Sequence, residues 1–129
     1  MQLQKVNVRI TTLKVSGYWL IVISIIHALY DILYYFQPWS DIIHNGIFNT
    51  VDPYFDRGTA FWTLMVSPFI FSLGQLCCWA QEYNVRLPAF IGWNLLITSV
   101  FGAFLMPISG VWLLIPPSIF MIVSSHQKD

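Results

Sequence analysis

The stretch from Leu13 to Phe36, LKVSGYWLIVISIIHALYDILYYF, decides the fold class of this chain. Its apolar sequence is interrupted only by Lys14 near the start and by His27 and Asp31 farther along. A hydrocarbon core about 30 Å thick requires about 20 helical residues. The stretch is therefore long enough to cross a bilayer as one helix. It is too long for a signal peptide, and no small-residue cleavage site follows it, so we expect it to be retained.

Three further apolar stretches follow, at residues 59–80, 88–106 and 109–123. All are continuous rather than alternating, which favours helices over the strands of a membrane β-barrel. Only a few residues connect the last two stretches, so these should form an antiparallel hairpin. The sequence predicts an all-α, multi-pass membrane protein: four transmembrane helices in an antiparallel bundle, forming a single domain over residues 1–129.

The composition excludes several other classes of protein. Hydrophobic residues make up 57% of the chain and charged residues 9%, against roughly 25% charged residues in ordinary soluble domains. So few charges cannot cover a surface that faces water, which excludes a soluble enzyme and a disordered chain. With six basic and six acidic residues, the chain has no net attraction for nucleic acid.

The basic residues predict the orientation in the membrane. Five of the six lie before the first stretch, between the second and third, or at the end of the chain; they are Lys5, Arg9, Lys14, Arg86 and Lys128. Only Arg57 lies on the other side. By the positive-inside rule, both termini are cytoplasmic and residues 37–58 are external.

The external segment is long and partly apolar. Trp39, Ile42, Ile43 and Ile47 recur at helical spacing, which predicts a short amphipathic helix in the outer interface between the first two spans. Ser40 is the expected N-cap of this helix. Asp52 and Pro53 are the expected start of the second long helix.

The candidate chemistry lies in the first span. His27, Tyr30, Asp31 and Tyr34 are spaced i, i+3, i+4 and i+7, so they are expected on one face of the helix. Titratable residues inside a span are costly and are functional candidates for that reason. A carboxyl group one turn from an imidazole suits general acid–base chemistry, with His27 and Asp31 as the catalytic pair. The same pair also suits a buried polar network without a function.

Other spans supply candidate ligand contacts at the same depth. In addition to Tyr30 and Tyr34, we expect the substrate-binding residues to be Arg57, Trp62, Ser67, Thr98 and Trp112. Arg57 is the only external basic residue, so it is expected to pair with Asp31, with Asp56 as a local competitor. The aromatic residues among these also fit a belt at the membrane boundary. Prolines at Ser67-Pro68 and Pro116-Pro117 are expected to bend their helices.

The layout of four spans, the length and the polar first helix resemble small bacterial membrane proteins of the DoxX-like kind. This resemblance covers the whole chain but rests on no specific motif, so it implies no site residue. The small multidrug exporters also have four spans, but the chain is less similar to them. Their first helix carries an essential glutamate and their loops are short, whereas here the first-helix acid is Asp31 and the external segment is long.

Three classes of function remain. The first is a protein that binds, and converts by proton transfer, a small apolar molecule such as an isoprenoid, sterol-like or quinone compound, with residues 37–58 as a lid. The others are a proton-coupled carrier acting as a homo-oligomer and an accessory subunit of a larger membrane complex. We predict no metal and no cofactor. His27 and His44 are potential haem ligands, but no paired histidines occur at facing depths.

Overall fold

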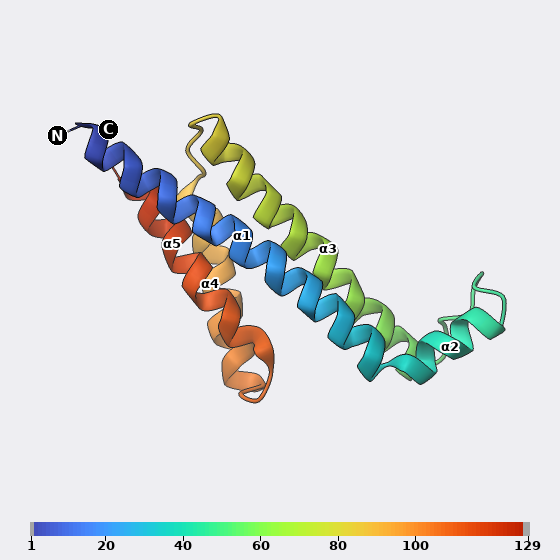
Figure 1. Ribbon diagram of the computed structural model, residues 1–129. Coiled ribbons are helices and arrows are strands. Elements are labelled where there is room, and N and C mark those ends of the chain that lie inside the picture. Colours follow the sequence, from blue (N-terminus) through green and yellow to red (C-terminus); the bar gives the residue numbers. More distant parts are fainter. Residues whose placement is uncertain (1, 128–129) are drawn as a thin grey trace.

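The computed structural model describes the backbone of residues 2–127 and the side chains from residue 12 onward (Figure 1). Within that part, the chain is helical and contains no strand. The elements are α1 (Gln2–Tyr34), α2 (Phe36–His44), α3 (Phe55–Glu82), α4 (Ala89–Leu105), a 3₁₀ turn η1 (Gly110–Leu114) and α5 (Ile115–His126). The all-α prediction is confirmed.

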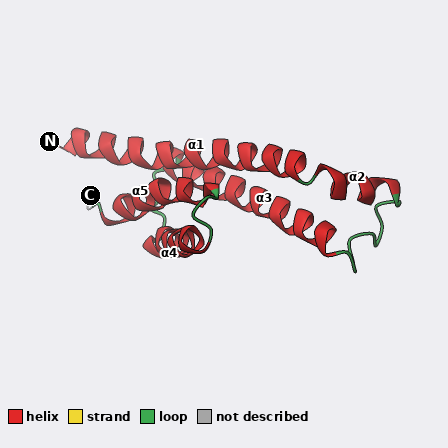
Figure 2. Cartoon of the chain, turned by 90° about the horizontal axis from the view of Figure 1, so that it is seen from below, coloured by secondary structure: helices red, strands yellow, loops and turns green. Residues whose placement is uncertain are grey.

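The two longest helices, α1 and α3, pack side by side (Figure 2). At one end of their contact Gly17 faces Gly74, and farther along His27 of α1 faces Ser67 of α3. Residue numbers rise along one helix as they fall along the other, so the two helices run in opposite directions. A Cβ atom on Gly74 would lie 2.8 Å from the carbonyl oxygen of Gly17. The glycines therefore let the two backbones touch, as small residues do between membrane helices.

Helices α4 and α5 form a second pair that docks on the N-terminal half of α1 (Figure 1). Pro116 and Pro117 lie in the first turn of α5 and do not interrupt it, because a first-turn residue needs no helical N–H. The two prolines follow directly after the change from 3₁₀ to α geometry at Ile115, and not in the middle of one continuous α-helix. Pro117 offers no N–H to the carbonyl of Leu113, and the indole Nε1 of Trp19 donates to that oxygen instead, at 2.8 Å.

The short helix α2 follows α1 after a break at Tyr35. It begins at Phe36, so the expected N-cap Ser40 lies inside the helix and its hydroxyl contacts His44. Pro38 is tolerated because it falls in the first turn. Gly46, with φ +95°, ends α2: its N–H donates to Ile43 and the next N–H donates to Ile42, which is a Schellman motif.

The predicted start of the second long helix was also wrong. Val51 to Tyr54 forms a turn in which the N–H of Tyr54 donates to the carbonyl of Val51 at 3.0 Å. Because this turn redirects the chain, α3 begins only at Phe55, and Asp52 does not cap it. At its other end α3 stops in a second Schellman motif, with Asn84 in the left-handed conformation.

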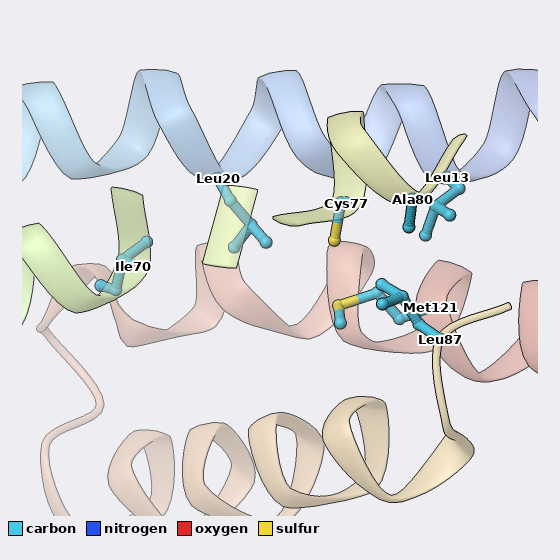
Figure 3. Packing of buried hydrophobic residues seen from close by; sticks show 7 residues of the cluster. All are labelled: Leu13, Leu20, Ile70, Cys77, Ala80, Leu87 and Met121. Carbon is cyan, nitrogen blue, oxygen red and sulfur yellow. The ribbon is translucent and has the colours of Figure 1, made fainter. Parts of the chain in front are cut away.

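The interior is rich in small residues, and most of the large apolar side chains outside one buried cluster are exposed. A cluster of buried side chains joins α1, α3 and α5 (Figure 3): Leu13, Leu20, Ile70, Cys77, Ala80, Leu87 and Met121. Around it, serines and alanines are buried on every long helix, among them Ser16, Ser24, Ala60, Ser99, Ala103 and Ser118. By contrast, Leu33, Phe69 and Phe104 are exposed. Soluble proteins bury such side chains, whereas membrane helices pack through small ones.

Two helices are long and apolar enough to cross a membrane, Thr12–Tyr34 and Phe55–Glu82. Two shorter apolar segments are Ala89–Leu105 and Gly110–His126. Only 28% and 22% of the most apolar windows of the two long helices are buried. A core helix of a soluble protein would be mostly buried, so these helices have the exposure expected of membrane spans. Three residues that predict the orientation, Lys5, Arg9 and Lys128, have side chains outside the described part.

Candidate functional site

The buried face of α1 meets the buried face of α3 along one line, which we call the α1–α3 seam. On α1 it contains Ser24, His27 and Asp31, spaced three to four residues apart, and on α3 it contains Ala60 and Ser67. These spacings keep each set on one side of its helix. The polar residues that the sequence predicted as catalytic therefore face a neighbouring helix.

His27 is half-buried and is held in place by α3. Its Nδ1 atom lies 2.9 Å from the hydroxyl oxygen of Ser67, and the two atoms share a hydrogen bond. Ser67 itself is 5% exposed. This bond fixes the imidazole and leaves its Nε2 atom free of any hydrogen bond to the described part of the chain. A histidine held at one nitrogen and available at the other can exchange a proton with a ligand.

Asp31 is buried, and its side chain has no hydrogen-bond partner among the described residues. Its side chain is 3% exposed, and its Oδ2 atom has no donor within reach. A buried polar group without a partner is destabilising, and an ionised one much more so. Unpaired groups of this kind are uncommon in native structures, which makes Asp31 a candidate binding group.

The expected ion pair between Asp31 and Arg57 is not formed. The Nη1 atom of Arg57 donates to the backbone carbonyl of Thr50 at 2.7 Å, and its guanidinium lies over the ring of Tyr54, 4.1 Å from the centroid. The turn before α3 brings Thr50 beside the first turn of that helix, so Arg57 finds its partner in the connecting segment. Neither Thr50 nor Tyr54 was predicted as its partner, although the i, i+3 spacing of Tyr54 and Arg57 is a usable signal.

The aromatic residues predicted to contact a ligand lie outside the seam. Tyr30 and Tyr34 stack on each other with ring centroids 5.6 Å apart, and both are exposed. Neighbouring helical residues point about 100° apart, so Tyr30 turns away from the face that carries Asp31. Trp62 on α3 is 71% exposed. The prediction that all four α1 residues share one face was therefore too broad.

The two candidates from the last pair of helices are also remote from His27. Thr98 on α4 is exposed, and Trp112 in η1 is exposed with its indole bonded to the carbonyl of Pro107 at 2.9 Å. Helix α4 packs on α5 and η1, and it makes no extensive contact with α1. In this single chain the structure brings together His27, Asp31 and Ser67 and leaves Thr98 and Trp112 apart.

The α3 side of the seam carries a further polar feature. Pro68 lies inside α3 and has no N–H, so the carbonyl of Leu64 loses its usual helical donor. Leu64 is one turn from Ser67 on the same side of the helix. Like the carboxyl group of Asp31, this carbonyl accepts hydrogen bonds. Among the side chains from residue 12 to residue 127, no three histidine, cysteine or acidic groups cluster as metal ligands would.

The chain belongs to a protein family: residues 11–128 match the Family of unknown function (DUF6463). No curated protein and no solved structure matches the chain. The match covers every residue named in the α1–α3 seam.

Proposed function

We propose that this member of DUF6463 is a four-span integral membrane protein that binds a small lipophilic molecule at the α1–α3 seam. In this arrangement α1, α3, α4 and the η1–α5 segment cross the bilayer in alternating directions, both termini are cytoplasmic, and α2 lies in the outer interface. The exposed large apolar side chains and buried small ones support it, because lipid tails cover the former and close packing requires the latter.

The observation that carries the proposal is the buried, unpaired carboxyl group of Asp31, one turn from His27. Inside a bilayer no water is present to satisfy it, and the described residues supply no donor to Oδ2. A ligand with a hydroxyl or amine group would complete the site. The apolar remainder of that ligand would lie among the exposed side chains of α1 and α3. Isoprenoid alcohols, sterol-like molecules and reduced quinones have this chemistry.

The pair also supports proton transfer as a second step. His27 is anchored through Nδ1 to Ser67, which leaves Nε2 to donate or accept a proton. Asp31 would bind the ligand hydroxyl, and His27 would exchange a proton with the ligand. An acid–base enzyme acting on a lipophilic substrate would have this division of roles.

A second candidate function is supported by a different observation. The outer halves of α1 and α3 extend past the α4–α5 pair (Figure 1), and Tyr30, Tyr34 and Trp62 are exposed there. A homo-oligomer would cover this surface with a second copy. Such an assembly suits a proton-coupled carrier, whereas a different membrane protein on the same surface would make this chain an accessory subunit.

Mass spectrometry of the small molecules that co-purify in a mild detergent tests the proposal. We expect a lipophilic compound with the wild-type chain and its loss with Asp31→Asn. Asp56→Asn is the matched control, because it makes the same change at an exposed position near the same end of the bundle. Equal amounts of every compound in the wild type and Asp31→Asn would refute binding at Asp31.

A parallel comparison tests the role of the histidine. We expect His27→Gln to retain the compound partly and to lose any conversion of it, whereas His44→Gln changes neither. His44 is exposed and bonds only within α2, so it controls for loss of an imidazole. Unchanged conversion in His27→Gln would assign His27 a structural role.

A further inference from the structure

Arg57 is a buried cation in the first turn of α3. Its side chain is only 8% exposed, although arginine is charged at every physiological pH. Its one hydrogen bond to the described part of the chain goes to the carbonyl of Thr50, at 2.7 Å. A guanidinium carries five N–H groups, so most of its donors remain without a protein acceptor.

No counter-ion for Arg57 lies among the described residues. Asp31 makes no ion pair with it, and neither does its neighbour Asp56, which is exposed. The ring of Tyr54 covers one face of the guanidinium, and a cation–π contact of this kind contributes only about 0.5–2 kcal/mol. Burying a charge costs more than this unless the charge is paired. The unbonded nitrogen atoms of Arg57 are not among the fully buried unpaired atoms of the described residues, so an anion from outside the chain can reach them.

A second buried donor lies at the same end of the molecule. The indole Nε1 of Trp39, on α2, is buried and has no acceptor. Helix α2 packs against α3, which begins two residues before Arg57. Helices α2 and α3 contact each other, and each contains a side-chain donor without a full set of acceptors among the described residues. An anion with several oxygen atoms is the complementary partner of the Arg57 guanidinium.

The position of Arg57 indicates which anion this is. The apolar run of α3 begins at Phe55, so Arg57 lies at the membrane boundary, where phosphate groups are concentrated. We propose that Arg57 binds a phosphate group at the outer end of the bundle. Guanidinium groups bind phosphate through parallel N–H···O bonds, which the free edge of Arg57 can supply. The inference rests on the membrane arrangement proposed above and not on a ligand at Asp31.

Native mass spectrometry of the purified full-length chain tests this inference with three probes: phosphatidylglycerol, diacylglycerol and inorganic phosphate. Diacylglycerol has the same tails as the first probe but no phosphate. We expect Arg57→Gln to lower the affinity for phosphatidylglycerol about tenfold, the loss of about one charge-assisted hydrogen bond, and to leave diacylglycerol unchanged. Arg86→Gln, which removes an exposed arginine from the connection between α3 and α4, should bind like the wild type.

The probes separate the two sources of phosphate. Loss of phosphatidylglycerol binding alone assigns a lipid headgroup, whereas loss of inorganic phosphate binding assigns a free phosphate group. If the wild type and Arg57→Gln bound phosphatidylglycerol equally and also bound inorganic phosphate equally, the inference would be overturned. If Arg57→Gln does not fold, Arg57→Lys keeps the charge without the planar fork, and wild-type affinity in that variant would overturn it too. Measuring the Asp31→Asn chain in parallel keeps failure here distinct from failure at the Asp31 site.

Discussion

At the scale of single residues, the stability of variants at Asp31 and Arg57 distinguishes a structural role of Asp31 from a binding role. The carboxyl group of Asp31 forms no ion pair with Arg57. Its Oδ2 atom has no partner among the described residues, and Arg57 donates to Thr50 instead. We therefore expect Asp31→Asn to leave thermal stability in detergent unchanged or raised, because a buried neutral amide costs less than a buried carboxylate. Arg57→Gln should lower stability by about 1–2 kcal/mol through loss of its bond to Thr50.

The double variant distinguishes this structure from the ion pair that the sequence predicts. The two effects should add within about 0.5 kcal/mol, as they do for residues that do not interact. Thermal unfolding of the wild type, the two single variants and the double variant gives the changes in stability that are compared. A double variant clearly more stable than that sum would restore a direct interaction between Asp31 and Arg57.

The sequence identifies some residues of the α1–α3 seam and adds others that lie outside it, because spacing along a helix does not show which part of a face is buried. Their spacing identifies His27 and Asp31 as one polar stripe, and both lie on the side of α1 that meets α3. The same spacing also admits Tyr30 and Tyr34, because a stripe of four residues covers a wide arc of the helix. Only the position of α3 shows which part of that arc is buried. Arg57 was expected to pair with Asp31 because it is the only external basic residue, and nothing in the sequence indicates that Thr50 lies beside it.

Among the helices, the closest approach between α1 and α3 is at Gly17 and Gly74. A Cβ atom at residue 74 would meet the backbone oxygen of Gly17 at 2.8 Å and the backbone nitrogen of Ile21 at 3.0 Å. Backbone atoms cannot move aside without separating the helices, so we expect Gly74→Ala to destabilise the protein by about 1–3 kcal/mol. Thermal unfolding in detergent gives the value.

Gly58 provides a matched control in the same helix. A Cβ atom at this position meets nothing within 4 Å, so Gly58→Ala should be neutral or stabilising by up to about 1 kcal/mol, the gain in helix propensity. If both substitutions had the same effect, the close packing of α1 on α3 would be wrong.

A hydrogen bond joins α1 to η1 at a carbonyl group that Pro117, which has no N–H, leaves without its helical donor. Trp19 donates to the carbonyl of Leu113, which Pro117 leaves without its helical N–H. We expect Trp19→Phe to cost about 0.6–1 kcal/mol. In a Pro117→Ala background the new N–H can bond to Leu113, so the same change should cost less. An equal cost in both backgrounds would show that the indole contributes by packing and not by this hydrogen bond.

Element boundaries were predicted less well than the elements themselves. Apolar length identified four helical regions, and each contains a helix. The expected caps at Ser40 and Asp52 failed because the chain already turns at Tyr35 and at residues 51–54, where local hydrogen bonds outweigh a side-chain cap. Gly46 and Asn84 were usable stop signals, since both favour the left-handed conformation that ends a helix.

For the whole molecule, the membrane arrangement makes a prediction about sidedness. Asn49 follows α2 at one end, and Ser125 lies near the end of α5, at the other end of the molecule (Figure 1). After Cys77 and Cys78 are replaced by alanine, single cysteines at these positions should react with a membrane-impermeant maleimide from opposite sides of sealed vesicles. Labelling of both from the same side would exclude the four-span arrangement.

The central claim is the proposal that the buried carboxyl group of Asp31 binds a lipophilic ligand that reaches it from the bilayer. Modification by a lipophilic carbodiimide, followed by intact-mass and peptide analysis, tests it most directly, because this reagent enters membranes and reacts with carboxyl groups. We expect one adduct per chain, located at Asp31, absent in Asp31→Asn and retained in Asp56→Asn. The co-purified lipophilic compound should slow its formation. An adduct that persists in Asp31→Asn, or a reaction with water-soluble carbodiimide only, would contradict the account.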